Sequence, residues 1–159
     1  MSNISRKLKK QAKKTDHISK ETLPKIQYAR YVDRIKAFIT DMFMIYTPIL
    51  YAITYVVLGT KEEFQQSTLG PLSAVVLYGL IYAVFISKTG QTPGKKAYSI
   101  KVVDSTTHEN ISFLRALWRF IAFLMSASIL IGLILPFYNK EKKALHDILA
   151  KTIEIEIKS

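Results

Sequence analysis

The sequence predicts an all-α membrane protein, a small transmembrane helical bundle with a short cytoplasmic two-stranded β pair. Three apolar blocks of the 159-residue chain predict the bundle, at residues 37–58, 69–87 and 120–138. The second and third blocks contain no Asp, Glu, Lys or Arg, and their length matches the hydrocarbon core of a bilayer, which takes about twenty apolar residues. A soluble core helix would show a polar face at helical spacing, which the second block lacks.

The chain divides into a basic tail at residues 1–27 and a transmembrane domain at residues 28–158. The tail is rich in lysine and poor in apolar residues, so we expect it to be disordered and cytoplasmic. A short helix lying on anionic lipid headgroups is the alternative for this tail. Because the tail is polar and has no early apolar region, we expect no cleavable signal peptide.

The net charge of +11 comes from basic segments that flank the apolar blocks. This distribution follows the positive-inside rule and predicts a multi-pass protein of the plasma (inner) membrane with a cytoplasmic N-terminus. No basic face with interleaved aromatic residues accompanies the charge, so we expect no nucleic-acid partner. The absence of cysteine excludes disulfides and thiolate metal sites.

The first predicted span joins a charged segment, Arg34–Asp41, to an uncharged run at residues 42–58. A carboxylate at this place needs a partner, water or a proton, because an unpaired charge in a membrane helix is costly. Pro48 is expected to kink the helix, since it lacks an N–H donor. Gly59–Thr68 is a loop poor in positive charge, which we assign to the outside, and Leu69–Ser87 returns as the second span.

The segment after the second span is assigned to the cytoplasm. It opens with the turn-rich motif Gly90-Gln91-Thr92-Pro93-Gly94-Lys95. The motif is not a phosphate-binding P-loop, because only three residues separate its glycines and no Ser or Thr follows the lysine. Tyr98–Val103 then reads as a short β-strand.

A second strand is predicted at residues 152–158, where apolar and polar residues alternate strictly. We expect it to pair with Tyr98–Val103. In this pair three isoleucines would face the apolar residues of the first strand, and a glutamate would meet its lysine. The residues concerned are Ile153, Ile155, Ile157, Ile100 and Val102, with Glu154 or Glu156 opposite Lys101.

Strand pairing places limits on the third apolar block. Both strands must lie on one side of the membrane, so we expect the third block to bend and return, near Ser126-Ala127-Ser128 or Gly132. Irregular backbone at such a bend would need shielding by protein or water. A single ordinary crossing is the alternative, and it would put the C-terminus outside.

Three motifs together resemble those of a known family. They are Arg34-x-x-Ala37-x-x-x-Asp41, the Gly90–Lys95 motif and Leu145-His146-Asp147. In this order they are similar to the RDD family of small integral membrane proteins, and the similarity covers Tyr28–Ile157. The family is named for one arginine and two aspartates, which correspond here to Arg34, Asp41 and Asp147. Thr40 and Lys151 depart from the usual pattern. The resemblance implies a membrane protein with a suspected role in transport.

The motif residues predict a polar site in the cytoplasmic half of the bundle. Its members are Arg34, Asp41 and Asp147, with Arg119, Arg115 and His146 as candidate partners. Gly90, Gln91, Pro93, Gly94 and Lys95 form the cytoplasmic loop motif beside it. We expect Arg119 to be the partner of Asp41, because both enter the membrane at a similar depth.

Two functions remain open for this site. A buried carboxylate beside an arginine can bind a cation or exchange a proton, which favours a component of ion or solute transport. The alternative is a non-catalytic membrane assembly or lipid-interacting subunit whose Arg/Asp residues are structural. Two or three spans cannot enclose a solute path alone, so a transport role would need a homo-oligomer or a partner membrane subunit. The lipid bilayer is the other expected partner. We expect no enzyme, metal or cofactor, because no nucleophile or metal-ligand spacing accompanies His146 and Asp147.

Overall fold

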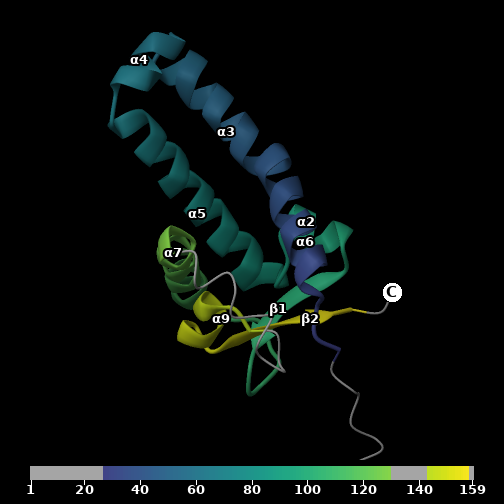
Figure 1. Cartoon of the computed structure of the whole chain (residues 1–159). Coiled ribbons are helices and arrows are strands. Elements are labelled where there is room, and N and C mark those ends of the chain that lie inside the picture. Colours follow the sequence, from purple (N-terminus) through teal and green to yellow (C-terminus); the bar gives the residue numbers. More distant parts are fainter. Residues whose placement is uncertain (1–26, 130–142, 158–159) are drawn as a thin grey trace, which may run out of the picture.

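The computed structural model describes residues 27–129 and 143–157. Two long helical columns rise side by side from a layer that holds the sheet and two of the short helices, and another short helix joins the columns at their far ends (Figure 1). In chain order the elements are α2 (Tyr31–Asp41), η1 (Met42–Tyr46), α3 (Thr47–Tyr51), η2 (Ala52–Val57), α4 (Lys61–Gln66), α5 (Leu69–Thr89), α6 (Pro93–Ala97), β1 (Ile100–Asp104), α7 (Phe113–Ile129), α9 (Leu145–Leu149) and β2 (Thr152–Glu156).

The first column is one helical stretch of 27 residues, Tyr31–Val57. It therefore begins earlier than the apolar block at residues 37–58. Two π-helical turns, η1 and η2, flank the short α-helix that contains Pro48. A wider turn here lets the backbone adjust around the missing N–H donor, and the hydroxyl of Thr47 donates to Met42 O at 3.0 Å.

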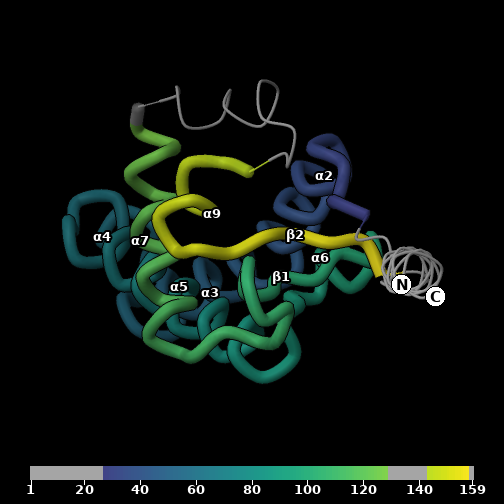
Figure 2. The backbone as a smooth tube through the Cα atoms, turned by 90° about the horizontal axis from the view of Figure 1, so that it is seen from below, coloured from purple at the N-terminus to yellow at the C-terminus, as the bar shows by residue number. Residues whose placement is uncertain are grey.

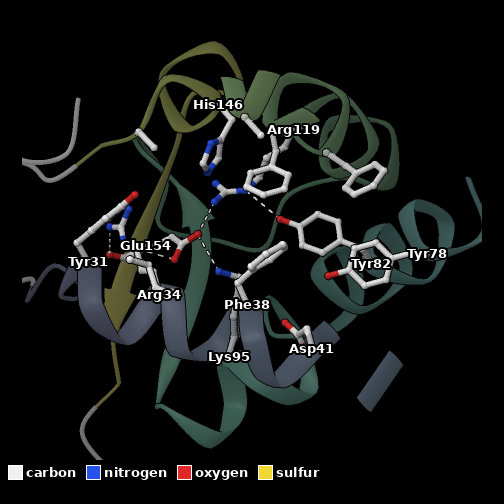
Figure 3. Close-up of a pocket in the computed structure, with 15 residues that line it drawn as sticks. Tyr31, Arg34, Phe38, Asp41, Tyr78, Tyr82, Lys95, Arg119, His146 and Glu154 are labelled. Carbon is white, nitrogen blue, oxygen red and sulfur yellow. Dashed lines mark hydrogen bonds and ion pairs between the residues drawn. The ribbon is translucent and has the colours of Figure 1, made fainter. Parts of the chain in front are cut away.

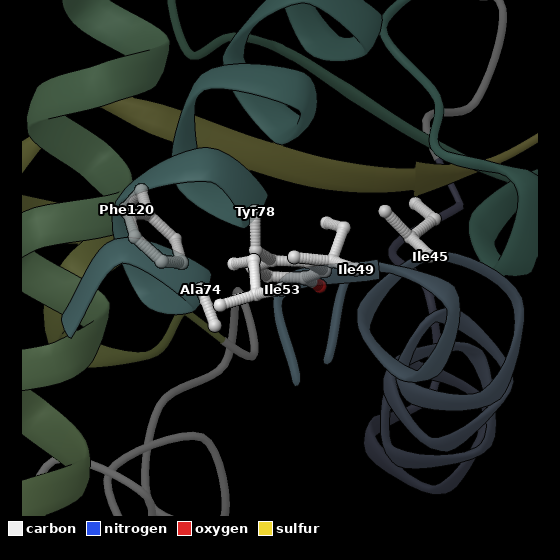
Figure 4. Packing of buried hydrophobic residues seen from close by; sticks show 6 residues of the cluster. All are labelled: Ile45, Ile49, Ile53, Ala74, Tyr78 and Phe120. Atoms are coloured by element: carbon white, nitrogen blue, oxygen red, sulfur yellow. The ribbon is translucent and has the colours of Figure 1, made fainter. Parts of the chain in front are cut away.

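The second column, α5, packs against the first column and against α7. Six buried residues form the core between these helices (Figure 4): Ile45, Ile49, Ile53, Ala74, Tyr78 and Phe120. At Gly79 a Cβ atom would lie 2.4 Å from the ring of Phe120, so only glycine allows α7 to approach this closely. The Tyr78 ring lies 5.6 Å from the Phe120 ring and 5.8 Å from the Tyr46 ring.

Both columns are long and apolar enough to cross a bilayer, as the first two blocks predict. Only 28% and 33% of their most apolar segments are buried inside the molecule. Large apolar side chains such as Phe43, Val56 and Leu69 are 73–79% exposed. Exposed apolar surface of this extent is unfavourable in water and marks a surface that something else covers.

The predicted strand pair is present, and β1 and β2 are antiparallel neighbours. The predicted register is wrong, however. Ile155 lies opposite Lys101, and Glu154 lies opposite Val102. Directly opposed residues share one face of a sheet, so Glu154 points with Val102 toward the helices and is 2% exposed. The alternation of isoleucine and glutamate predicts that the isoleucines face the core and the glutamates face away from it. Glu154 departs from this prediction, because ion pairing allows its charge to be buried.

The chain entering α2 extends the sheet. Tyr28 forms a β-bridge with Ile155, and Gln27 O accepts from the backbone N–H of Glu156 at 2.8 Å. Seen from below, β2 runs between α9 and the start of α2 (Figure 2). The proposed disordered tail, apart from Gln27, lies outside the described residues.

The third apolar block is helical as far as the structure describes it. Helix α7 runs without a break through Ser126-Ala127-Ser128, so the bend predicted there is wrong. The hydroxyl of Ser128 donates to Leu124 O at 2.9 Å inside the helix. Gly132 and the rest of the block lie outside the described residues. β1 and β2 nevertheless lie in one sheet. This strand pairing is the reason why the third block was expected to return.

Candidate functional site

Five charged side chains meet where the columns join the sheet layer, and we call them the ion-pair cluster. Each comes from a different element, namely α2, α6, α7, α9 and β2. All are at most 9% exposed, and Figure 3 shows several of them around a cavity. The members are Arg34, Lys95, Arg119, Asp147 and Glu154. The cluster therefore holds together five elements that are spread along the sequence from α2 to β2.

Asp147 contacts two arginines and its own helix start. Its Oδ2 accepts from Arg34 Nη1 at 3.0 Å and from the backbone N–H of Ala144 at 3.0 Å. Its Oδ1 lies 2.6 Å from Arg119 Nη1. The bond to Ala144 caps α9, as an acidic residue in the first turn commonly does.

Glu154 contacts all three cations of the cluster. Its Oε1 accepts from Lys95 Nζ at 2.8 Å and from Arg119 Nη2 at 2.5 Å. Its Oε2 lies 3.4 Å from Arg34 Nε. Arg34 also donates to the backbone oxygen of Glu154 at 3.3 Å, so side chain and strand are held together.

Arg119 is the most buried cation of the cluster, at 1% exposure. Besides the two carboxylates, its guanidinium donates to the hydroxyls of Tyr82 and Thr152. It does not pair with Asp41, which corrects the expected pairing. The reason is geometric, because α9 and β2 bring Asp147 and Glu154 to the guanidinium first.

The cluster holds its carboxylates ionised. Burial raises the pKa of Glu154, but Lys95, Arg34 and Arg119 outweigh burial and keep this pKa well below its usual range. Burial likewise raises the pKa of Asp147, and Arg119 and other neighbours lower it to a greater extent. Both groups are therefore poor proton carriers at neutral pH.

His146 lies beside the cluster as a neutral imidazole. Burial lowers the pKa of His146 to about 4. Its Nε2 is 3.6 Å from Asp147 Oδ1, longer than a hydrogen bond, and its Nδ1 has no hydrogen-bond partner among the described residues. The ring packs edge-on against Phe123, with centroids 5.3 Å apart.

Asp41 has a different role from the other two residues of the Arg/Asp trio. Its Oδ2 accepts from the Thr92 hydroxyl at 2.5 Å, and its Oδ1 accepts from the Gly94 backbone N–H at 2.8 Å. Among the described residues it forms no ion pair. Asp41 thus anchors the Gly90–Lys95 motif to α2.

The Gly90–Lys95 motif is shaped for this anchoring. Gly90 ends α5 in the left-handed conformation, with φ of 73°. At Gly94 a Cβ atom would lie only 2.1 Å from Ala37 O, so the loop touches α2 through bare backbone. Pro93 opens α6 behind the N-cap Thr92, and Gln91 donates to Ile100 O at 2.8 Å.

Arg115 is separate from the ion-pair cluster. Its guanidinium pairs with Asp104 at 2.5 Å and donates to the carbonyls of Ala150 and Lys151. It therefore holds the end of α9 against β1. The bonds from Thr106, Thr107 and Arg115 lower the pKa of Asp104 to about 2.

A metal ion would have to compete with the cluster's own cations. Ligand atoms of His146, Asp147 and Glu154 lie within 4.8 Å of one another. Both carboxylates, however, already contact arginine or lysine nitrogens at 2.5–3.0 Å. The arrangement fits ion pairing better than metal binding.

A cavity of about 460 Å³ lies next to the cluster (Figure 3). Its polar side carries charged groups of the cluster together with Asp41 and His146. Its other walls are aromatic and aliphatic side chains of α2, α5 and α7. These walls include Ile35, Phe38, Tyr78, Tyr82, Phe120 and Phe123. The site is thus amphipathic, with a charged end and an apolar body.

Three residues of the site are not predicted from the sequence. Thr92 precedes a proline, which is a recognisable signal for a helix N-cap. Tyr82 lies within the uncharged block at residues 69–87, yet its hydroxyl accepts a hydrogen bond from Arg119 Nε at 3.1 Å. Glu154 carries no local signal, because its burial depends on the side chains of Arg34, Lys95 and Arg119, which come from other elements.

Comparison with known proteins supports the motif assignment. The chain is similar to protein YxaI of Bacillus subtilis (strain 168), which is described as uncharacterized, with 40% identity over 80 residues. The alignment covers 50% of this chain and 50% of YxaI, so the chain spans about half the length of that relative. No solved structure matches the chain. The RDD family matches residues 28–151, which is most of the sequence, and the protein belongs to the RDD family.

Proposed function

We propose that this chain is a non-catalytic, lipid-interacting membrane subunit whose Arg/Asp residues hold its fold together. The observation that carries this proposal is that both carboxylates of the ion-pair cluster are already paired with cations. Asp147 and Glu154 each contact at least two cationic side chains at 3.4 Å or less. Carboxylates held in this way stabilise contacts between elements, and they are unsuited to exchanging ions or protons during a cycle.

The proposed location is the plasma (inner) membrane, with the first column, Tyr31–Val57, and α5 crossing it and the N-terminus in the cytoplasm. The exposed apolar surface of the columns and the basic residues that flank the blocks support this arrangement. Only about a third or less of each column's most apolar segment is buried inside the molecule. This supports assembly with a second copy or a partner membrane subunit.

Orientation can be tested with single cysteines, because the natural chain has none. Gln65→Cys is exposed on α4, and Thr106→Cys is exposed in the loop after β1. A membrane-impermeant thiol reagent should label Gln65→Cys on intact cells and Thr106→Cys only after permeabilisation. The reverse pattern, or equal labelling of both, would contradict the proposed topology.

Lipid interaction can be tested on purified protein in detergent. A ligand that binds only the folded state raises the melting temperature as its concentration increases. We expect the Tm to rise steadily as bilayer lipids are added, with added detergent alone as the control. A Tm that does not respond to lipid would count against the lipid-interacting role.

A transport role has one observation in its favour, the position of Asp41. This carboxylate borders the cavity and forms no ion pair among the described residues. If it couples ion movement, Asp41→Asn should abolish flux in reconstituted vesicles while Asp33→Asn leaves flux intact. Absence of flux in the parent protein, or unchanged flux in Asp41→Asn, would contradict the transport role and leave only the structural role.

A further inference from the structure

We propose that the cavity beside the ion-pair cluster binds a single-chain amphiphile with an acidic headgroup, carboxylate or phosphate. The chain would lie among the apolar walls and the head against Arg34 and Lys95. This inference rests on the proposed lipid-interacting function and names the class of lipid.

The apolar body of the cavity suits one hydrocarbon chain. Its volume of about 460 Å³ falls in the range of sites for single small ligands, about 300–1,000 Å³. Two of its wall residues on α2, Ile35 and Phe38, are themselves 42% and 39% exposed. The cavity thus borders the side of α2 that the proposed bilayer would cover, and a chain can enter from there.

The charged end of the cavity has hydrogen-bond donors to spare. An ammonium group has three donors, and Lys95 Nζ uses one of them, on Glu154 Oε1 at 2.8 Å. A guanidinium has five donors. Arg34 donates from Nη1 and from Nη2, and its Nε, 3.4 Å from Glu154 Oε2, has no hydrogen-bond partner among the described residues. The remaining N–H groups of both residues have no acceptor among the described residues, and an acidic head would supply one.

Carboxylates also line the cavity, so their effect on an acidic head must be considered. Glu154 is neutralised by the three cations around it. Asp41 accepts from Thr92 and Gly94 with its two oxygens. Asp147 lies beneath the surface at 0% exposure. A cationic head would have to displace Lys95 or Arg34 from Glu154, whereas an acidic head adds contacts and breaks none.

Photolabelling in nanodiscs of phosphatidylcholine would test the proposal. The probes are diazirine derivatives of dodecanoate, dodecyl phosphate, dodecanol and dodecyltrimethylammonium, with labelled residues identified by peptide mass spectrometry. We expect an acidic probe to label α2 and α7 about tenfold more than dodecanol does, the factor for one charge-assisted hydrogen bond. Preference for dodecanoate points to a free fatty acid, and preference for dodecyl phosphate to a phosphate headgroup; either supports the proposal.

Two cavity-filling variants locate the labelled site. Ala127→Phe fills the cavity from α7, and Ile35→Trp fills it from α2. Their matched controls are Met125→Phe and Val32→Trp, on the same helices at residues that are 58% exposed and do not line the cavity. Labelling should fall about tenfold in the cavity variants and persist in the controls. Using two walls means that the test does not depend on one variant folding.

Other outcomes would overturn the inference. Equal labelling by all four headgroups, or labelling that neither cavity variant reduces, would exclude an acid-selective site in this cavity. If the Tm still rises with added lipid, the lipid-interacting function survives and only the ligand class fails. A Tm that ignores lipid is the separate result that removes the function itself.

Discussion

Arg34 Nη1 donates a hydrogen bond to Asp147 Oδ2 at 3.0 Å, although the two residues are 113 positions apart in the sequence. The same oxygen accepts from the N–H of Ala144, so one carboxylate fixes the start of α9 against α2. Arg119 contacts the other oxygen at 2.6 Å. The arginine and one aspartate of the RDD trio thus connect the two ends of the domain.

Asp147→Asn should destabilise the protein strongly. The amide keeps the size of the side chain but leaves two buried arginines short of a counter-charge, which costs about 3–5 kcal/mol. The matched control is Asp33→Asn, because Asp33 pairs with the 72%-exposed Arg30; its cost should be much smaller than that of Asp147→Asn, since solvent screens an exposed ion pair. Denaturant titration in detergent measures both, and equal losses would contradict a structural role for Asp147.

Gly94→Ala should prevent the Gly90–Lys95 motif from docking. Its Cβ atom would lie 2.1 Å from Ala37 O and 2.9 Å from the carboxylate of Asp41, and backbone cannot yield to that extent. At the control position, Gly70→Ala, the nearest atom is in the ring of Phe64 at 3.0 Å, which can shift. We expect loss of folded protein in size-exclusion chromatography for the first variant only.

Thr92→Val separates helix capping from the anchoring of Asp41. The Thr92 hydroxyl accepts from the N–H of Lys95 and also donates to buried Asp41. Thr60 caps α4 in the same way, at an exposed place. Thr60→Val should therefore cost about 1 kcal/mol, and Thr92→Val about 1–3 kcal/mol more. Similar costs would show that the bond to Asp41 contributes little.

His146 should make the protein sensitive to mild acid. The pKa of His146 is about 4 in the folded protein and 6.5 in the unfolded chain. Between these two pH values the unfolded chain therefore binds more protons than the folded protein does. Stability therefore falls as the pH drops from about 6.5 to about 4, by about 3 kcal/mol in all. Below that range the lowered pKa values of Asp147 and Glu154 continue the loss in the same direction.

The variant His146→Gln isolates this histidine. Unfolding free energies measured at intervals between pH 7 and pH 4 should depend much less on pH than in the parent. His108→Asn is the control, because His108 is exposed and has φ of 59°, which asparagine tolerates. If His146→Gln keeps the full pH dependence, another group is responsible for it.

The helical columns and the strand pair were predictable because their signals are local. Uninterrupted apolar runs at residues 42–58 and 69–87 indicate long helices whatever they pack against. Alternation at residues 152–158 indicates a strand. The register was not predictable, because a slip of one residue inverts both faces and only a tertiary contact selects between the two. That contact is the burial of Glu154.

The sequence by itself determined the two apolar helices, the two strands and the motif residues Arg34, Asp41 and Asp147. Only the tertiary structure decided how these charges are shared. It assigns Arg34 and Asp147 to one cluster and Asp41 to Thr92 and Gly94. The physical reason is that a buried charge takes whichever partner the packing brings within about 3 Å, and packing joins residues that the sequence keeps far apart.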